Sequence, residues 1–387
     1  MTSRRTRMIG AVCILAALAL PMDLAAQDYE VTILQGLGGG AGANSINNRG
    51  WVAGQANREG DAVSRAALWM SGPIPVDLGS LGGPDTNSAV AWPVKSNSGV
   101  IVGISDTLQD NPLSPLQNSF SCWPFFAPGA PTGKVCKGFR WENGVMTALP
   151  AFPGGYNSYA TAVNDRGQIV GWAENGVHDP TCDPDWQTLQ FHAVIWGSRG
   201  QMQDLRPLSG DSTSAATAIN AKGQVVGISG DCGIAVGGVS ARHMALWENG
   251  VPQRIEDLGG HTWNTPTAIN KDGVVVGFSL TPDQEGTTNF HAFVWTNEGG
   301  IKRLDEVPGT IRSQALGIND NNQIVGFVRI AGVGLRAVIW QTPTAPVQML
   351  NDLAPGDPIL IIAGDINNDG RIAGYTAQGT GFLAVPR

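Results

Sequence analysis

Five ring-bearing side chains stand in segments that interrupt an otherwise regular sequence: Trp123, Tyr156, Trp186, His261 and Trp263. Rings on exposed loops stack against the C–H faces of sugars or against apolar peptide side chains, while nearby amides and carboxylates give the contact its direction. The pattern therefore predicts a ligand-binding surface made of these residues. The alternative interpretation is that the rings are lids, which pack their loops onto the domain beneath.

Carboxylates close to this aromatic set indicate a second kind of chemistry. Asp179, Asp183 and Asp185 stand close together on either side of Cys182, with a proline after each of the first two. Such a group can bind calcium, or two of its members can act as general acid and base with His178 or His261 beside them. Because two prolines are interleaved with the acids, a solvated loop is the competing interpretation.

A second acidic pattern lies near the C-terminal end of the sequence. Asp365, Asn367 and Asp369 alternate and precede a glycine, as at the start of a calcium loop. The twelfth position of such a loop carries a glutamate, whereas this chain has Thr376 there. The same segment also fits an ordinary hairpin turn, so both interpretations stay open, and calcium is the one cofactor that the sequence suggests.

Four cysteines follow residue 26: Cys122, Cys136, Cys182 and Cys232. Four cysteines allow three pairings, and an exported protein can form disulfides. We favour Cys122 with Cys136 inside one segment and Cys182 with Cys232 between two segments. A four-thiolate metal site is the alternative, although no Cys-x-x-Cys spacing is present.

Three histidines occupy equivalent places, four positions before a tryptophan: His192, His243 and His291. Other copies of the same string have a basic residue there, namely Arg65, Lys137 and Arg336. A repeated position explains these histidines without a metal. The sequence also has no nucleophile elbow, His-Glu-x-x-His pair or phosphate loop.

One repeated phrase supplies the elements that position all these residues. It runs small or apolar residue, Ile or Val, Asn, two residues, Gly, any residue, Val or Ile, any residue, Gly. Seven copies are present, near residues 44–54, 93–103, 162–171, 218–227, 268–277, 317–326 and 365–374. The second copy is degraded because Ser96 replaces the Asn, and Asn322 replaces the first Gly of the sixth copy.

Each copy predicts a β-hairpin, since Gly and Asn adopt the positive φ that a tight turn requires. A third strand that ends in Trp and a short fourth strand follow most copies. Four strands in about 50 residues is the size of a propeller blade. With 52 Gly and 24 Pro, the chain is rich in turns, and no helix of ten residues is expected. We predict an all-β, seven-bladed β-propeller of four-stranded blades.

The two ends of the chain predict how this ring closes. The seventh copy has no fourth strand after residues 381–385, whereas residues 29–34 form a fourth strand without three predecessors. Pairing the two completes the seventh blade and removes a free sheet edge. Residues 27–387 then form one domain. Residues 1–26, basic and then apolar, are typical of a cleaved signal peptide, which predicts a periplasmic or extracellular protein.

The charge balance limits the partners of the chain. The formal net charge is -8, and 14% of the residues are charged. Affinity for a polyanion requires clustered Lys and Arg, so neither nucleic acid nor an anionic membrane surface is expected to bind. After the signal peptide no stretch is long and apolar enough to insert into a membrane. The oligomeric state leaves no trace in the sequence.

Residues 291–295 (HAFVW), with weaker relatives at 192–196 and 243–247, resemble the HAF repeat family of probable extracellular repeat proteins. The turn at 77–83 and the hairpin phrase are similar to the repeat of that family as well. The resemblance covers nearly all of the chain after residue 26 and implies export and a bacterial source. It brings no established activity, substrate or catalytic residue.

Long insertions occur where the second strand of a blade meets the third, at about 106–136, 174–190 and 230–241 in blades two to four. Because binding residues tend to lie on loops held by a rigid scaffold, we expect the site on that face. The first hypothesis is a non-catalytic binding module for a glycan or an extracellular protein. The alternatives are a secreted carbohydrate-active enzyme, lyase or hydrolase, on the same face, and a purely structural surface repeat protein.

Overall fold

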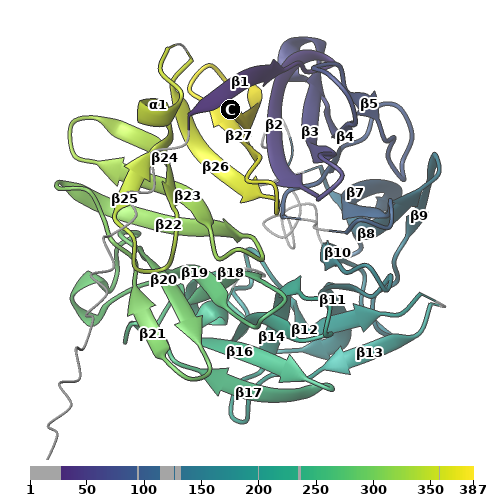
Figure 1. Cartoon of the computed structure of the whole chain (residues 1–387). Helices are drawn as coiled ribbons and strands as arrows, with labels where there is room; N and C mark the ends of the chain where they lie inside the picture. The colour runs from purple at the N-terminus through teal and green to yellow at the C-terminus, as the bar shows by residue number, and fades with distance from the viewer. Residues whose placement is uncertain are drawn as a thin grey trace, which may run out of the picture.

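Seven antiparallel sheets of four strands each stand around a common axis (Figure 1), so the chain is the predicted β-propeller. The structure is a computed structural model. It describes residues 28–93, 96–113, 126, 132–198, 200–233, 237–356 and 358–387. In the part of the chain so described, no helix has the length and apolar character needed to cross a membrane.

Blades one to four follow one another along the chain. Blade one contains β2 (Gly38–Ile46), β3 (Val52–Arg58), β4 (Ser64–Trp69) and β5 (Val76–Asp77). Blade two contains β6 (Ser88–Ala89), β7 (Ile101–Asp110), β8 (Lys134–Glu142) and β9 (Val145–Ala148). Blade three contains β10 (Ser158–Val163), β11 (Ile169–His178), β12 (Leu189–Trp196) and β13 (Met202–Leu205). Blade four contains β14 (Thr213–Ile219), β15 (Val225–Gly230), β16 (His243–Glu248) and β17 (Val251–Ile255).

The last three blades complete the ring. Blade five contains β18 (Thr265–Ile269), β19 (Val275–Ser279), β20 (His291–Thr296) and β21 (Gly300–Arg303). Blade six contains β22 (Thr310–Ile318), β23 (Ile324–Ile330), β24 (Gly334–Trp340) and β25 (Val347–Met349). Blade seven contains β26 (Leu360–Ile366), β27 (Ile372–Thr376), β28 (Gly381–Pro386) and β1 (Tyr29–Leu34). Short helices occur at Glu59–Asp61, Gly238–Ala241, Pro282–Gln284 and, as α1, at Leu350–Leu353.

Blade seven is built from both ends of the chain, as predicted. Strand β1 pairs antiparallel with β28, in a register that joins Tyr29 to Pro386 and Leu34 to Gly381. Tyr29 and Leu34 are both buried. The N-terminal strand therefore covers the sheet edge that β28 would otherwise expose, and it holds the ring closed.

The repeated Asn and Gly make the turn between the first two strands. In blade four, Oδ1 of Asn220 accepts the backbone N–H groups of Lys222 and Gln224, both at 3.0 Å. Gly223 then adopts a φ of +87°, and in blade six Asn322 takes the same role at +63°. The predicted turn chemistry is confirmed, because only Gly and Asn adopt such φ values at little cost.

The tryptophan at the end of the third strand joins neighbouring blades. The indole N–H of Trp196 donates to the carbonyl of Pro150 at 3.0 Å, just after the fourth strand of the preceding blade. The same bond recurs from Trp69 to Gln35, from Trp247 to Arg206 and from Trp340 to Asp305. These side chains are buried. The repeat tryptophans are thus inter-blade packing residues.

Blade two departs most from the repeat. Its first strand has only two residues, and Ser96 follows Ala89 by seven positions, whereas Asn164 follows the equivalent Tyr159 by five. Its predicted insertion is shorter than expected, because β7 continues to Asp110 and pairs there with Lys134 of β8. Cys136 therefore lies in a strand rather than in a loop. An antiparallel ladder continues after a bulge wherever both chains stay extended, which the sequence pattern did not reveal.

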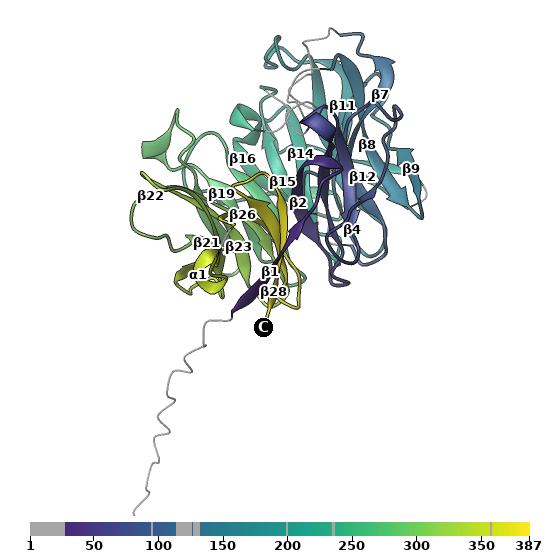
Figure 2. The ribbon, with the colours of Figure 1, turned by 90° about the horizontal axis from the view of Figure 1, so that it is seen from above.

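The ring has two different faces. The Asn-turn face carries the turns between first and second strands, and the insertion face carries the connections between second and third strands. Figure 2 shows the long hairpins of β7 and β11 on one side of the ring and the ends of β1 and β28 on the other. The two faces are described separately below.

Candidate functional site

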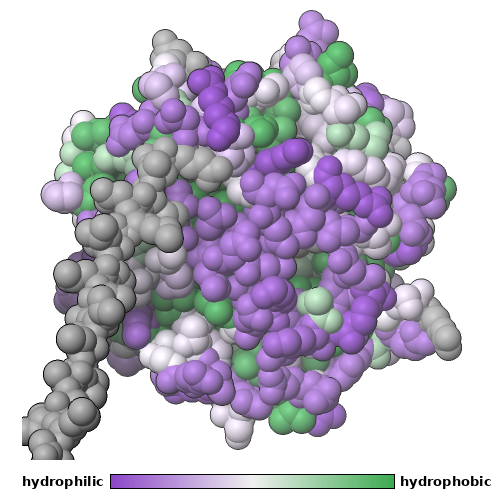
Figure 3. All heavy atoms as spheres, viewed as in Figure 1, coloured by the Kyte–Doolittle hydropathy of each residue, from purple (hydrophilic) through white to green (hydrophobic). Residues whose placement is uncertain are grey.

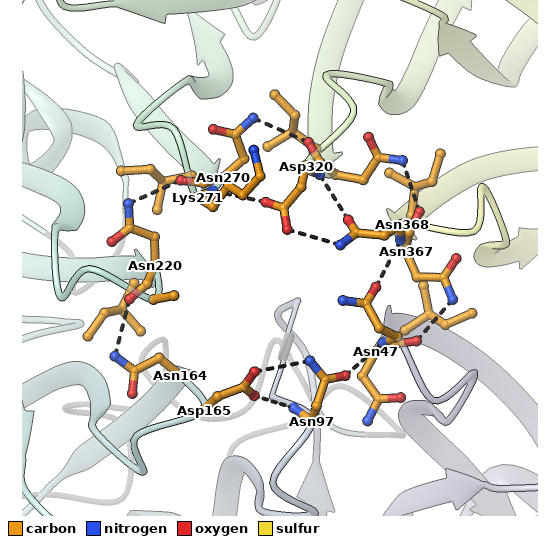
Figure 4. Close-up of a pocket in the computed structure, with 18 of the residues that line it drawn as sticks. Asn47, Asn97, Asn164, Asp165, Asn220, Asn270, Lys271, Asp320, Asn367 and Asn368 are labelled. Atoms are coloured by element: carbon orange, nitrogen blue, oxygen red, sulfur yellow. Dashed lines mark hydrogen bonds between the residues drawn. The ribbon is translucent and has the colours of Figure 1, made fainter.

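On the Asn-turn face, the repeat asparagines form a ring of hydrogen bonds between blades (Figure 4). Each side-chain Nδ2 donates to the backbone carbonyl of the equivalent residue in the next blade. The distances are 3.1 Å from Asn164 to Asn220, 3.0 Å from Asn220 to Asn270, 3.3 Å from Asn270 to Asn319, 2.9 Å from Asn319 to Asn367, 3.0 Å from Asn367 to Asn47 and 2.9 Å from Asn47 to Ser96. Blade two closes the ring weakly, since Ser96 Oγ lies 3.5 Å from the carbonyl of Asn164.

A hollow of about 120 Å³ lies inside this ring, at the axis of the propeller. Hydrophilic side chains cover the centre of the face in Figure 3, and the residues before the asparagines, among them Ile219 and Ile269, form an apolar floor. A second, incomplete ring surrounds the first: the N–H of Lys271 donates to Asp320, and that of Asp320 to Asn368, at 3.0 and 2.9 Å. Most of these polar groups already hydrogen-bond one another. The residues around the hollow therefore link neighbouring blades.

The proposed calcium residues belong to the same hydrogen-bond network between blades. The carboxylate of Asp365 accepts the N–H of Ile46 from the next blade at 3.0 Å, and Asn367 Oδ1 accepts those of Asp369 and Arg371. In the described ranges, no three His, Cys, Asp or Glu side chains gather as a metal site requires. The arrangement is that of the hairpin turn, and calcium there remains an untested hypothesis.

On the insertion face, covalent and backbone bonds fasten neighbouring insertions to one another. The predicted disulfide Cys182–Cys232 is confirmed and links blade three to blade four. Beside it, the N–H of Asp183 donates to the carbonyl of Gly233 at 3.0 Å, and the N–H of Trp263 donates to that of Gly238 at 3.1 Å. The insertions of blades three and four and the turn that carries Trp263 thus form one connected rim, beside which the insertion of blade two stands. Cys136 is buried, and its predicted partner Cys122 lies outside the described residues.

Apolar side chains stand exposed along this rim. The exposed fractions are 73% for Leu108, 51% for Val177, 37% for Trp186 and 37% for Val239. Three of the four were missed from the sequence, because the search concentrated on aromatic rings. The available signal was an apolar residue among polar ones in or beside an insertion, as at Leu108 and Val177.

The predicted aromatic residues are spread along the rim rather than gathered in one pocket. Tyr156 is half-buried, and its carbonyl accepts the ammonium of Lys137. Trp186 is partly exposed, His261 is exposed with its N–H bonded to Glu285, and Trp123 lies outside the described residues.

Trp263 is held between two blades. Its ring lies 5.5 Å from that of Phe290, and a Cβ on Gly237 would come within 2.3 Å of it. Its φ is +57°, which is unusual for a bulky residue and needs surrounding packing to hold it. This placement favours the lid interpretation for Trp263.

Two of the three acids of the blade-three insertion, Asp179 and Asp183, serve as local hydrogen-bond acceptors. Asp183 accepts the N–H of Asp185 at 3.1 Å, and Asp179 accepts both the N–H and the hydroxyl of Thr181. Burial raises the pKa of Asp179, but hydrogen bonds from Thr181, Ser212 and Gln190 outweigh it and lower the pKa overall. A general acid requires the opposite shift.

Two buried carboxylates lie beneath the rim and were not predicted. Glu174 is fully buried and accepts Asn157 Nδ2 at 3.0 Å, and Asp106 accepts Asn87 Nδ2 at 3.1 Å. Burial raises the pKa of both carboxyl groups, although these hydrogen bonds favour the charged form. The two pairs occupy the same place in successive blades, so they are a recurring interior link and not an accessible acid–base pair.

The three histidines are likewise separate. Nδ1 of His192, His243 and His291 lies 3.0, 2.9 and 3.0 Å from a carboxylate of Asp204, Asp211 and Glu306 respectively. Arg65 makes the equivalent contact with Asp77 in blade one. The three histidines and Arg65 thus each have an acidic partner of their own, as the structural interpretation of these histidines requires.

Comparison with known proteins adds only the fold. No protein-family model and no curated protein sequence matches the chain. A streptogramin B lyase structure is similar with a TM-score of 0.50 and 13% identity, over 94% of this chain and 100% of that chain. Virginiamycin B lyase from Staphylococcus aureus gives 0.49 and 11% over 93% and 100%, and YCF48 bound to D1 peptide gives 0.48 and 12% over 96% and 99%. At 13% identity, the similarity to the streptogramin B lyase structure concerns the fold alone and implies no common activity.

Proposed function

We propose that this protein is an exported, non-catalytic binding module whose ligand contacts the insertion face over blades two to four. The observation that carries the proposal is the set of exposed apolar side chains on this face, next to insertions that are bonded to one another. Leu108, Val177, Trp186 and Val239 remain exposed although the same insertions bury other apolar residues. Exposed apolar groups on a connected surface are the usual mark of an interaction site.

The bonds within the rim favour binding for a second reason. Ordering a loop on binding costs free energy, and a loop that is already held loses less. The Cys182–Cys232 disulfide and the backbone bonds at Gly233 and Gly238 hold the insertions of blades three and four before any ligand arrives. A rim of this kind suits recognition of an extended surface, so we propose a glycan or an extracellular protein as the partner.

Export and family membership belong to the same proposal. A disulfide persists in oxidising compartments such as the periplasm or the extracellular space. The Cys182–Cys232 bond is consistent with the signal peptide inferred from residues 1–26, which lie outside the described residues. We also propose that the chain is an HAF repeat protein, on the strength of the HAFVW string at 291–295.

An enzyme on the same face is the second candidate. It would use Asp179, Asp183 or Asp185, with His178 or His261, on a polysaccharide. The oxygens of Asp179 and Asp183 are engaged in local turns, and the carboxyls with raised pKa values are buried, which favours the binding module. Release of reducing or unsaturated ends by the wild type, abolished in Asp183→Asn, would instead support the enzyme.

The test of the binding module uses matched apolar substitutions. Val177→Ser combined with Trp186→Ser removes two rim side chains, whereas Val145→Ser combined with Val251→Ser removes two residues of 63% and 60% exposure far from the rim. Arrays of polysaccharides and of extracellular peptides would be probed with each protein. We expect the rim pair to weaken binding roughly tenfold or more, as two partly buried contacts imply, and the control pair to leave it unchanged. Equal effects of the two pairs, or a wild type that binds nothing, would count against the proposal.

A further inference from the structure

Two arginines stand opposite each other in blade six. Arg312 and Arg329 are direct cross-strand partners in β22 and β23, two strands labelled in Figure 1. Like charges directly opposite each other destabilise a sheet. Burial, and next the charge of Arg329, lower the pKa of Arg312. Within the described part of the chain neither guanidinium forms an ion pair, although the protein has an excess of acidic residues.

The repeat makes this pair stand out. In blades two and three the same two places hold an amide and a carboxylate: Asn87 with Asp106, and Asn157 with Glu174. The residue after the first of them is a serine in all three blades, so the backbone positions correspond. In blades two and three a side chain of the protein therefore provides the carboxylate at this place. Blade six instead has two cations at these places, and the protein supplies no anion between them.

Aromatic rings hold Arg312 in a fixed orientation. Its guanidinium carbon lies 4.9 Å from the ring centre of Phe290 and 5.5 Å from that of Phe327. Trp263 and Phe278 pack against Phe290 in turn, with ring centres 5.5 and 5.0 Å away. A guanidinium that is stacked on its flat face keeps its edge for hydrogen bonding, and the Nε of Arg312 is buried without a partner.

We propose that Arg312 and Arg329 form a carboxylate-binding site on the insertion face, at the end of blade six. A guanidinium recognises a planar carboxylate through paired, charge-assisted hydrogen bonds. One bound carboxylate also removes the repulsion between the two arginines. The net charge of -8 disfavours a polyanion and favours a single acidic group. This site lies in blade six and does not depend on the rim of blades two to four.

The experiment measures ligand-dependent thermal stabilisation and affinity. Sodium glucuronate and sodium N-acetylglycinate are the probes, methyl glucoside is the neutral control, and sodium chloride keeps the ionic strength constant. We expect both carboxylates to raise the unfolding midpoint, because a ligand that binds only the folded state stabilises it. A stronger effect of glucuronate would identify an acidic sugar as the source, and equal effects would identify the carboxylate alone.

Two substitutions separate a site from mere packing. Arg329→Gln changes an exposed side chain and should weaken carboxylate binding roughly tenfold or more, while the ligand-free protein becomes more stable. Arg49→Gln is the matched control, because Arg49 also stacks on a ring, that of Trp51 at 5.3 Å, but in a turn of the Asn-turn face, where it has no cross-strand partner. The proposal fails if chloride or methyl glucoside stabilises as much as the carboxylates do, or if Arg329→Gln binds them like the wild type.

Discussion

The two faces of this propeller use the same repeat in opposite ways. On the Asn-turn face six blades carry an asparagine at the same place, and each amide bonds the next blade. On the insertion face blades two, three, four and six each differ from the others. Polar groups that satisfy one another have little left for a ligand, whereas unequal loops present side chains that the ring does not need. The repeated asparagines hold the ring of blades closed, and the residues that depart from the repeat are the candidates for ligand binding.

The largest expected effect comes from breaking one link of the asparagine ring. Asn220→Ala removes the bond to Asn270, the bond to the Gln224 side chain and the two bonds that Asn220 accepts from its own turn. At roughly 1 kcal/mol per bond, the free energy of unfolding should fall by about 3–4 kcal/mol. Chemical denaturation followed by tryptophan fluorescence would measure the loss.

Asn175→Ala on the insertion face is the matched control for that substitution. Asn175 also accepts a turn N–H, from Val177 at 2.9 Å, but its amide donates only within its own blade, to Gln190. Because the bond from Val177 is exposed to solvent and contributes little, we expect a loss of about 1 kcal/mol. If the two asparagines cost the same, the ring has no special role in closure and the contrast between the faces is weaker than the contacts imply.

A second, smaller effect should be confined to the insertion face. Cys182→Ala with Cys232→Ala releases the link between blades three and four, which encloses a loop of 50 residues. Because the surrounding blades already restrain that loop, we expect a loss of about 2 kcal/mol, at the low end for a disulfide. Hydrogen exchange should quicken in residues 174–190 and 230–242. Equal quickening in the asparagine turns would show that the two faces are coupled.

The sequence predicts the Asn-turn face well because its signals are local and repeated. The turn made by Asn220 and Gly223 spans only a few residues, and its counterparts, like those of Trp247, recur at fixed spacing. Closure through residues 29–34 was predictable for a similar reason, since a missing fourth strand at one end matched a spare strand at the other. The hydrogen bond from each asparagine to the next blade was not predicted, because it joins residues about one repeat apart.

The insertion face was predicted less completely because its contacts are not periodic. Cysteine spacing and export favoured the Cys182–Cys232 pairing, which is confirmed. Nothing in the string around Trp263 showed that its ring lies against Phe290, and the extension of β7 to Asp110 depends on a bulge. The pairing of Arg312 with Arg329 becomes visible only once the blades are aligned strand by strand.

The smallest expected effect would repair the asparagine ring where the repeat fails. In the other blades one asparagine side chain accepts two N–H groups of its turn. In blade two, two serine hydroxyls accept them instead: Ser96 accepts the N–H of Ser98, and Ser98 accepts that of Val100. The bond to the next blade is correspondingly long, at 3.5 Å to the carbonyl of Asn164. Ser96→Asn supplies an amide that can make all three contacts, so the free energy of unfolding should rise by about 0.5–1 kcal/mol. Denaturation of this variant beside the wild type measures the gain. A loss of stability would mean that the longer segment between Ala89 and Ser96 holds residue 96 out of reach of blade three, and that the ring tolerates one permanent gap.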